Sequence, residues 1–256
     1  MTRNVRSLAL ALGLWPLASL MAHAQGSQSD RDFRWDGAIS SGRWAYVRNL
    51  NGSVRVERAS GGRLEVTAVK RWRRGNPEDV RVEVTRVGSG EGDILVCALW
   101  RDITEDCDER GYRTRNDRRR DRWSRDNNDD VSLEITVRVP EGVKVDLSSI
   151  NGGIDARSSG GPVNASTVNG NIDVHMGVIG SGNLDFSTTN GSINVTVPDG
   201  LNADITMRTV NGSVGSDFPM TVNGRISPRR IAATIGRGGM KIDLSTVNGS
   251  IDLRRG

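Results

Sequence analysis

Apolar and polar residues alternate along most of the chain that follows residues 1–24. The clearest runs place apolar side chains at every second position, in four sets: Val54 and Val56; Leu64, Val66 and Ala68; Val80, Val82 and Val84; and Leu133, Ile135, Val137 and Val139. A period of two is typical of β-strands that bury one face. Helical periodicity is almost absent, so the pattern predicts an all-β protein.

A longer pattern is built around a recurring Asn-Gly dipeptide. Apolar or small residues, or a hydroxyl, stand six, four and two positions before the asparagine, and mostly apolar ones three and five positions after it. The copies that follow this rule are centred on Asn151, Asn169, Asn190, Asn211 and Asn248, and Asn51 obeys most of it. The first four full copies follow one another at intervals of about 20 residues. Such spacing is typical of one coil of a β-solenoid.

One further Asn-Gly breaks the rule. Around Asn223, the offsets that should be apolar hold Asp217, Pro219 and Pro228. We therefore interpret "TVNGR" as a degenerate or bulged copy.

Two geometries are compatible with an Asn-Gly turn between alternating runs. One is a two-residue hairpin turn, in which both strands present one apolar face. The other is a solenoid corner, in which Asn or Gly takes the left-handed conformation and equal residues stack from coil to coil. The repeated Thr before the asparagine favours stacking, because stacked coils pair each residue with its own copy. We therefore expect a single-stranded β-solenoid with coils of about 20 residues, and an antiparallel hairpin sandwich is the alternative.

The N-terminal segment, residues 1–24, has the pattern of a secretory signal peptide. Arg3 and Arg6 precede an apolar run from Leu8 to Met21, and Ala22-His23-Ala24 follows it. The run is shorter than the roughly 20 residues that a membrane span needs. We expect an exported protein, periplasmic, surface-bound or secreted, with no transmembrane segment in the mature chain. Removing residues 1–24 leaves 33 basic and 31 acidic residues, so net charge predicts no particular partner.

Composition divides the mature chain into three regions. Residues 25–107 hold alternating strands and are expected to form an N-terminal β region that caps the solenoid. Residues 108–130, "DERGYRTRNDRRRDRWSRDNNDD", carry both charges without an apolar run and are predicted to be a flexible insertion. Residues 131–256 contain the repeats. Cys97 and Cys107 stand just before the insertion and are expected to form a disulfide in an oxidising compartment.

Few residues are candidates for chemistry. The histidine of the mature chain, His175, is expected to point outward from its strand, which argues against a catalytic role. Acidic residues recur four positions after the asparagine, at Asp155, Asp173 and Asp252, and we interpret them as a solvated face rather than a cation site. No catalytic, cofactor-binding or metal-binding residue is therefore predicted. The insertion offers one possible anion-binding cluster, for lipid phosphates or acidic glycans rather than nucleic acid: Arg118, Arg119, Arg120 and Arg122.

The repeats also carry a family resemblance. "NLNGSVRV", "VSLEITVRVPEGVKVDLSSINGGID", the recurrent "TVNGSI" and the closing "KIDLSTVNGSIDL" resemble the "putative-adhesin" domain family of bacterial exported proteins, whose members carry a domain of unknown function. The resemblance covers residues 35–256, apart from the charged segment at 97–130 and the copy near Asn223. It implies a right-handed β-solenoid with an extracytoplasmic, non-catalytic role.

Three hypotheses of function follow. The first is a non-enzymatic, adhesin-like envelope or surface protein that binds an unidentified macromolecule through a regular solenoid face. The second is an enzyme that acts on polysaccharide, because lyases and hydrolases also use such folds. The third is a binding module whose Arg-rich insertion docks to anionic envelope components.

Overall fold

The computed structural model describes residues 32–101, 103–114, 130–180, 182–222 and 227–256. Within these residues the chain is built from β-strands, with two single-turn 3-10 helices, η1 (Pro77–Asp79) and η2 (Ser89–Glu91). The all-β prediction is confirmed. The runs of alternating residues named above form strands β3, β4, β5 and β9, and their apolar side chains are buried except for Val84, which is partly buried.

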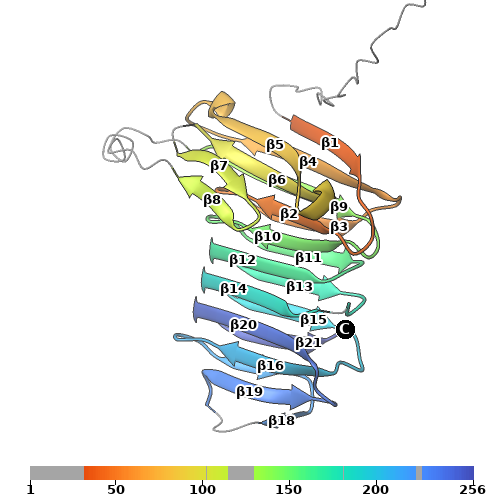
Figure 1. Cartoon of the computed structure of the whole chain (residues 1–256). Coiled ribbons are helices and arrows are strands. Elements are labelled where there is room, and N and C mark those ends of the chain that lie inside the picture. Colours follow the sequence, from red (N-terminus) through yellow and green to blue (C-terminus); the bar gives the residue numbers. More distant parts are fainter. Residues whose placement is uncertain (1–31, 102, 115–129, 181, 223–226) are drawn as a thin grey trace, which may run out of the picture.

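Most of the described strands belong to two large sheets (Figure 1). The strands of sheet A are, in spatial order, β1 (Asp32–Ala38), β4 (Arg63–Arg71), β9 (Ser132–Val139), β3 (Val54–Arg58), β11 (Ile154–Ser159), β13 (Ile172–Met176), β15 (Ile193–Val197), β21 (Ile251–Arg255) and β17 (Val214–Ser216). The strands of sheet B are β18 (Met220–Val222), β19 (Arg230–Ile235), β16 (Ala203–Arg208), β20 (Met240–Asn248), β14 (Leu184–Asn190), β12 (Val163–Asn169), β10 (Lys144–Ser148), β2 (Trp44–Arg48), β6 (Asp93–Trp100) and β5 (Val80–Val87).

Each Asn-Gly copy in the described part of the chain joins a strand of sheet B to a strand of sheet A. The pairs are β2 and β3, β10 and β11, β12 and β13, β14 and β15, β20 and β21, and β16 and β17. The two strands of such a pair lie in different sheets, and each pairs in parallel with the equivalent strand of a neighbouring coil. The dipeptide is therefore a corner between sheets and not a hairpin turn, which rules out the hairpin sandwich for these copies.

The spatial order of the coils differs from their order in the sequence. The coil of Asn248 is the last in the sequence, but it lies between the coils of Asn190 and Asn211. Strand β20 pairs with β14 on one side and β16 on the other, and β21 pairs with β15 and β17. In Figure 1 the last coil, coloured dark blue, accordingly lies above β16 and β19. The C-terminal strands thus lie inside the stack and pair with a neighbouring strand on each side.

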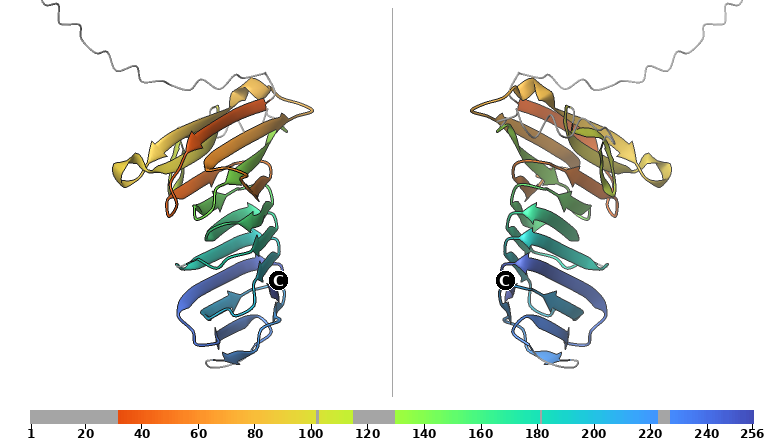
Figure 2. Two further views of the ribbon diagram at one scale, coloured as in Figure 1. Left: turned by 90° about the vertical axis from the view of Figure 1, so that its right-hand side faces the viewer. Right: turned by 90° about the vertical axis from the view of Figure 1, so that its left-hand side faces the viewer.

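Antiparallel strands extend the parallel stack at both ends. At the N-terminal end, β1 and β4 continue sheet A and β5 continues sheet B; at the other end, β19 and β18 continue sheet B. The sheets are therefore mixed, with parallel pairing in the middle. The N-terminal region also contributes to the stack itself, because β2 and β3 pair in parallel with β10 and β11. Figure 2 shows the coils stacked beneath the N-terminal strands.

The space between the two sheets is filled by one continuous core of small aliphatic side chains. It includes residues from β4 and β5 at the N-terminal end to β19 at the other, and Phe186 is a fully buried aromatic ring within it. A second, smaller cluster lies on the outer face of β6, where Leu95, Cys97 and Leu99 pack against Cys107. That cluster is covered by a hairpin of β7 (Thr104–Asp108) and β8 (Gly111–Thr114). The predicted disulfide between Cys97 and Cys107 is confirmed and ties the hairpin to β6.

Candidate functional site

The Asn-Gly corners line up along one edge of the stack. We define the Asn-Gly ridge as each corner asparagine and the residue before it on five successive coils, which in spatial order are Ile150 and Asn151, Val168 and Asn169, Thr189 and Asn190, Val247 and Asn248, and Val210 and Asn211. None of these side chains is ionisable. The ridge is therefore an uncharged strip on a chain in which about a quarter of the residues (26%) are charged.

The asparagine amides of the ridge form a continuous hydrogen-bonded ladder. Each Nδ2 donates to the Oδ1 of the next asparagine at 2.7 to 2.8 Å, from Asn169 to Asn151, Asn190 to Asn169, Asn248 to Asn190, and Asn211 to Asn248. At the N-terminal end Asn51 instead donates from Nδ2 to the backbone oxygen of Val131. The stacking that the repeats predicted is thus made by the asparagine side chains as well as by the strands.

The residue two positions before each asparagine forms a hydrogen bond to the Asn-Gly corner of the adjacent coil. The Thr167 hydroxyl donates to the backbone oxygen of Gly152 at 2.9 Å, and the equivalent hydroxyls of Ser149, Thr188, Thr246 and Thr209 donate to the glycine of the adjacent coil at 2.8 to 3.1 Å. These hydroxyl-bearing residues are buried. These hydrogen bonds are partly buried, and leaving a shielded carbonyl without a partner is costly, so the recurring hydroxyl stabilises the corner.

The glycine of the dipeptide is needed for close approach between coils. A Cβ on Gly170 would lie 2.3 Å from the backbone oxygen of Gly152, and a Cβ on Gly191 would lie 2.0 Å from that of Gly170. The left-handed conformation that we expected of Asn or Gly is found in this motif only at Gly52 (φ 114°) and Gly249 (φ 155°) among the described residues. The corner asparagines have negative φ, so they contribute side-chain bonds rather than an unusual backbone.

The residue before the asparagine projects into solvent. Val168 and Val247 are each 40% exposed and Val210 is 55% exposed. Among the described residues they are three of the four large apolar side chains with such exposure, and the fourth, Val178, lies outside the ridge. Single exposed apolar residues are ordinary on protein surfaces. The three valines recur at one offset beside the amide ladder, with Thr189 at the same offset between Val168 and Val247.

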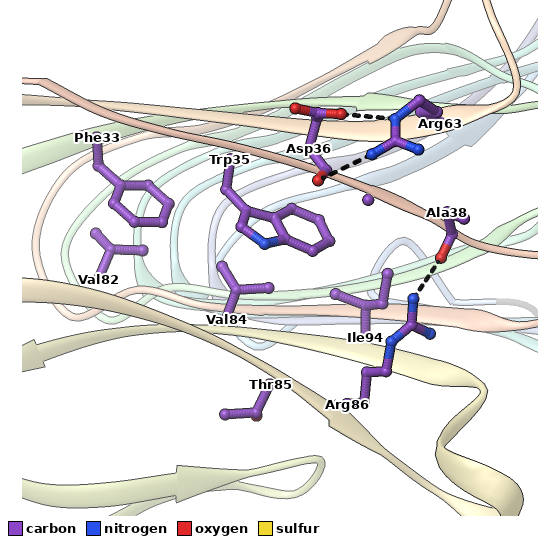
Figure 3. A pocket seen from close by; sticks show the side chains of 11 residues that line it. Phe33, Trp35, Asp36, Ala38, Arg63, Val82, Val84, Thr85, Arg86 and Ile94 are labelled. Carbon is purple, nitrogen blue, oxygen red and sulfur yellow. Dashed lines mark hydrogen bonds and ion pairs between the residues drawn. The ribbon is translucent and has the colours of Figure 1, made fainter. Parts of the chain in front are cut away.

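A cavity of about 500 Å³ opens at the N-terminal end of the molecule, between the edge strands β1 and β5 (Figure 3). Phe33 and Trp35 line it from β1, and Val82, Val84 and Ile94 line it from β5 and β6. Each of these residues is paired with a buried core residue on an adjacent strand. The cavity is thus the unfilled end of the space between the sheets.

The residues at the mouth of the cavity explain why it stays open. The core-facing series on β1 runs from Phe33 and Trp35 to Gly37, which has no side chain of its own and leaves room for the ring of Trp35. A Cβ on Gly37 would lie 2.3 Å from the indole ring of Trp35, so that ring lies over the glycine. The facing series on β5 ends at Arg86, which is in register with Ile94 although it is charged and exposed.

Two arginines border the cavity in different ways. Arg63 forms an ion pair with Asp36 at 2.6 Å, so its charge is matched. Arg86 donates to the backbone oxygens of Ala38 at 3.0 Å and Glu91 at 3.3 Å. Among the described residues Arg86 has no carboxylate partner. The cavity therefore combines an apolar wall with the guanidinium of Arg86 (Figure 3), which no carboxylate of the described ranges pairs with.

A third feature is a pair of carboxylates on the outer face of sheet B. Asp185 of β14 and Asp243 of β20 stand directly opposite each other. Burial, followed by the negative charges of Asp243 and Asp146, raises the pKa of Asp185 above its ordinary value. Nearby paired carboxylates are the groups that glycoside hydrolysis uses. These lie on an outer sheet face, however, and hydrolysis requires a cleft in which the two groups flank a bound sugar.

The comparisons with known proteins agree with the stacked fold. The family model described as Toastrack DUF4097 matches residues 127–254, which is half of the chain. The chain belongs to the Toastrack DUF4097 family. The match includes the five coils that form the Asn-Gly ridge, whereas β1, β5 and the cavity lie before its first residue. No curated protein matches this Toastrack chain.

Two solved structures are similar to the Toastrack chain. One is described as a "putative cell adhesion protein" from Clostridium sporogenes; it has 11% sequence identity and a TM-score of 0.58, and the match covers 88% of this chain and 100% of that one. The other, a "putative adhesin" from Bacteroides fragilis, has 11% identity over 89% of this chain and 98% of that one, with a TM-score of 0.29. At this identity, the first shows a shared fold only.

Several predicted residues of the Toastrack chain have defined surroundings. His175 is exposed on β13. In the row of acidic residues, Asp155 pairs with Arg157 at 2.9 Å, and Asp173 accepts a hydrogen bond from Asn194 at 2.7 Å. Across the described ranges, no group of three or more His, Cys, Asp or Glu side chains is arranged to hold a metal ion. Asp155 is thus matched by a neighbouring arginine, and Asp173 is bonded to the equivalent residue of the adjacent coil.

Other predicted features lie outside the described residues. These are the signal peptide, the four arginines Arg118, Arg119, Arg120 and Arg122, and the irregular Asn223 copy. The beginning of the charged segment is described, and there Gly111–Thr114 forms β8 while Arg113 pairs with Asp108 at 3.1 Å. No helix in the described part of the chain is long and apolar enough to cross a membrane.

Sequence reasoning missed the cavity and the exposed valines. The cavity had a detectable signal, because the alternating series Val80, Val82, Val84 ends at Arg86 on the same face. The valine line also had one, since "TVNG" recurs with a valine at an offset that the core pattern leaves unused. Neither signal shows by itself that the position is exposed.

Proposed function

We propose that this chain is a non-enzymatic, adhesin-like protein that is exported and binds a macromolecule of the cell envelope or cell surface through the Asn-Gly ridge. The observation that carries the proposal is the line of exposed valines Val168, Val247 and Val210 at one offset of the repeat. An apolar line beside an uncharged amide ladder is costly to leave in water, and exposed apolar patches commonly mark interaction sites.

The ridge fits this role because it is regular and rigid. Its asparagines bond to one another, and each corner is fixed by a buried hydroxyl. A surface whose side chains are already ordered loses little conformational entropy on binding. Successive coils lie about 4.8 Å apart, so an extended partner meets the same groups repeatedly. We infer that the coils form a single-stranded, right-handed solenoid, in keeping with the resemblance to exported adhesin-like proteins.

Two observations support export. Residues 1–24 have the charge, the apolar run and the small-residue end of a signal peptide. The disulfide between Cys97 and Cys107 is of a kind that persists in oxidising compartments. The proposal places the mature chain in the periplasm, on the surface or outside the cell.

The test compares binding to isolated bacterial cell envelopes by sedimentation. The ridge variant carries Val168→Ser, Val247→Ser and Val210→Ser together. The control is Val178→Ser, which removes a valine at least as exposed (53%) as Val168 and Val247, outside the ridge. Loss of apolar contact from three valines, at about 0.8 kcal/mol per buried methylene, should weaken binding at least about tenfold. The control should bind as the wild type does.

Equal binding by the ridge variant and the control would contradict the proposal, as would a wild-type protein that does not bind envelopes. Circular dichroism on both variants checks that the stack is intact. Little change is expected, because all the substituted side chains are exposed.

A further inference from the structure

We propose that the cavity between β1 and β5 is a binding site for an amphipathic anion, a molecule with a single apolar chain that ends in a carboxylate or phosphate. This site is separate from the Asn-Gly ridge and goes beyond the proposed function. It lies at the N-terminal end of the stack, outside the residues matched by the family model.

The apolar part of the ligand is specified by the cavity wall. Phe33, Trp35, Val82, Val84 and Ile94 present rings and aliphatic groups to the same space. The volume of about 500 Å³ lies within the range of small-molecule sites, roughly 300 to 1,000 Å³. Phe33, Trp35 and Val84 remain partly exposed, although they pack on the main core. A bound apolar chain would remove their exposed surface from water.

The anionic end is specified by Arg86. Alternation places this side chain on the face that carries Val82 and Val84, where a further apolar residue would close the core. Its guanidinium donates to two backbone oxygens, of Ala38 and Glu91. A guanidinium has five N–H donors, so others remain for a ligand. Because Arg86 has no carboxylate partner among the described residues, an incoming anion would supply the missing charge.

Arg63, the second arginine at the cavity, does not compete for this role. Its ion pair with Asp36 at 2.6 Å satisfies its charge. Asp36 and Arg63 alternate with the core-facing residues of β1 and β4, so the ion pair lies toward the outer face of sheet A. Arg86 is therefore the arginine left to select the ligand charge. Charge-assisted hydrogen bonds from an arginine to a carboxylate or phosphate are about twice as strong as neutral ones.

The test uses three probes with the same chain and different ends: decanoate, 1-decanol and decyltrimethylammonium, each titrated by calorimetry. Wild-type protein should bind decanoate more tightly than the cation. Arg86→Gln should weaken decanoate binding about tenfold or more, since a hydrogen bond to a charged group contributes about 1.5 to 3 kcal/mol. The same variant should bind 1-decanol as the wild type does. Decyl phosphate, titrated alongside, distinguishes a phosphate-ended from a carboxylate-ended ligand.

The matched control is Arg81→Gln on the same strand. Arg81 points away from the cavity and pairs with Glu83 at 2.7 Å, so its loss should leave binding of every probe unchanged. Trp35→Phe should retain binding but lose the tryptophan fluorescence change that accompanies decanoate. That loss would place the probe in this cavity.

Three results would overturn the proposal. The first is a wild-type protein that does not bind decanoate at millimolar concentration, and the second is an equal effect of Arg86→Gln and Arg81→Gln. The third is self-association of the wild type through this end, with the association lost in Arg86→Gln, which would assign the cavity to a second copy of the chain. None of these results affects the envelope-binding test of the ridge, whose variants leave the cavity intact.

Discussion

At the scale of single residues, the repeat is explained by hydrogen bonds and close contacts between the corners of neighbouring coils. Thr188 donates to the backbone oxygen of Gly170, and Asn190 donates to Asn169. Gly170 itself has no room for a side chain against Gly152. The corner therefore needs a hydroxyl, an amide and a glycine at fixed offsets. The positions were evident from the sequence, but their roles depend on the neighbouring coil.

At one repeated position, repulsion between stacked carboxylates lowers the stability of the fold. Asp185 and Asp243 are like charges directly opposite each other on neighbouring strands, an arrangement that destabilises a sheet. Partial desolvation and the nearby carboxylates raise the pKa of Asp185, so ionising this group is less favourable in the folded than in the unfolded protein. Ionised Asp185 thus reduces stability at neutral pH, and the reduction disappears as the pH falls below the ordinary value of 3.8.

We expect Asp185→Asn to stabilise the fold at pH 7. The gain should be about 0.5 kcal/mol, because the carboxylate is only partly desolvated and the remaining solvent contact screens the repulsion. That free energy corresponds to a rise of about 1 to 2 °C in the Tm of a domain of this size. The rise, measured by calorimetry, should vanish at pH 3. A variant with unchanged or lower Tm at pH 7 would contradict this account.

Asp204→Asn serves as the control of opposite sign. Hydrogen bonds from Thr234 and the Gly239 backbone lower the pKa of Asp204. Its ionised form is therefore favoured in the folded state, and neutralising it should lower the Tm at pH 7. This loss should diminish as the pH falls through the lowered pKa.

At the scale of elements, the β7–β8 hairpin is held against sheet B by a buried arginine. Arg48 is 2% exposed, forms an ion pair with Asp146 at 2.7 Å and donates to the backbone oxygen of Glu109 between β7 and β8. The Tyr112 hydroxyl of β8 donates to the backbone oxygen of Ala98 at 2.7 Å. Burial raises the pKa of Tyr112. The hairpin is thus tied down by side chains as well as by its disulfide.

We expect Arg48→Met to destabilise the protein by about 2 kcal/mol, because it leaves a partly buried carboxylate without its partner. Hydrogen exchange should also become faster at β7 and β8. Denaturant unfolding and exchange measured by mass spectrometry provide the readouts. Arg55→Met is the control: its ion pair with Asp155 is 3.8 Å long and exposed, so it should cost little. Equal losses for the two variants would refute the assigned role of Arg48.

The sequence could predict the disulfide but not the burial of Arg48. Cys97 and Cys107 are close in the chain and were expected to pair in an exported protein. Arg48 stands at an outward position of its strand, where a charged residue is expected to meet solvent. It is buried because a hairpin that begins more than fifty residues later folds over that face. The alternation of polar and apolar residues within one strand cannot show that a distant hairpin will cover its outer face.

At the scale of the whole molecule, the sequence predicted the stacked coils but not their order. Each coil has nearly the same edge, so the strands of Asn190 can pair with those of Asn211 or Asn248 by the same pattern. In the structure β20 and β21 lie between them. This placement makes the ridge continuous, since Asn248 bonds to both Asn190 and Asn211. The cavity could not be predicted for the same reason, because it forms where β1 and β5, which are far apart in the sequence, face each other.

The central claim, a continuous ridge completed by the C-terminal coil, is tested most directly by oxidative cross-linking of introduced cysteine pairs. Ser187 stands opposite Ser245, and Ser245 stands opposite Arg208, so Ser187 and Arg208 are two strands apart. Adjacent strands lie about 4.8 Å apart, within disulfide range, whereas positions more than about 7 Å apart cannot be bridged.

Mass spectrometry of the oxidised protein gives the yield of each cross-link. The account predicts that the Ser187→Cys/Ser245→Cys and Ser245→Cys/Arg208→Cys pairs form disulfides, and that the Ser187→Cys/Arg208→Cys pair does not. Efficient cross-linking of the last pair without the first would show that the coils stack in sequence order, and would contradict the continuous ridge described above.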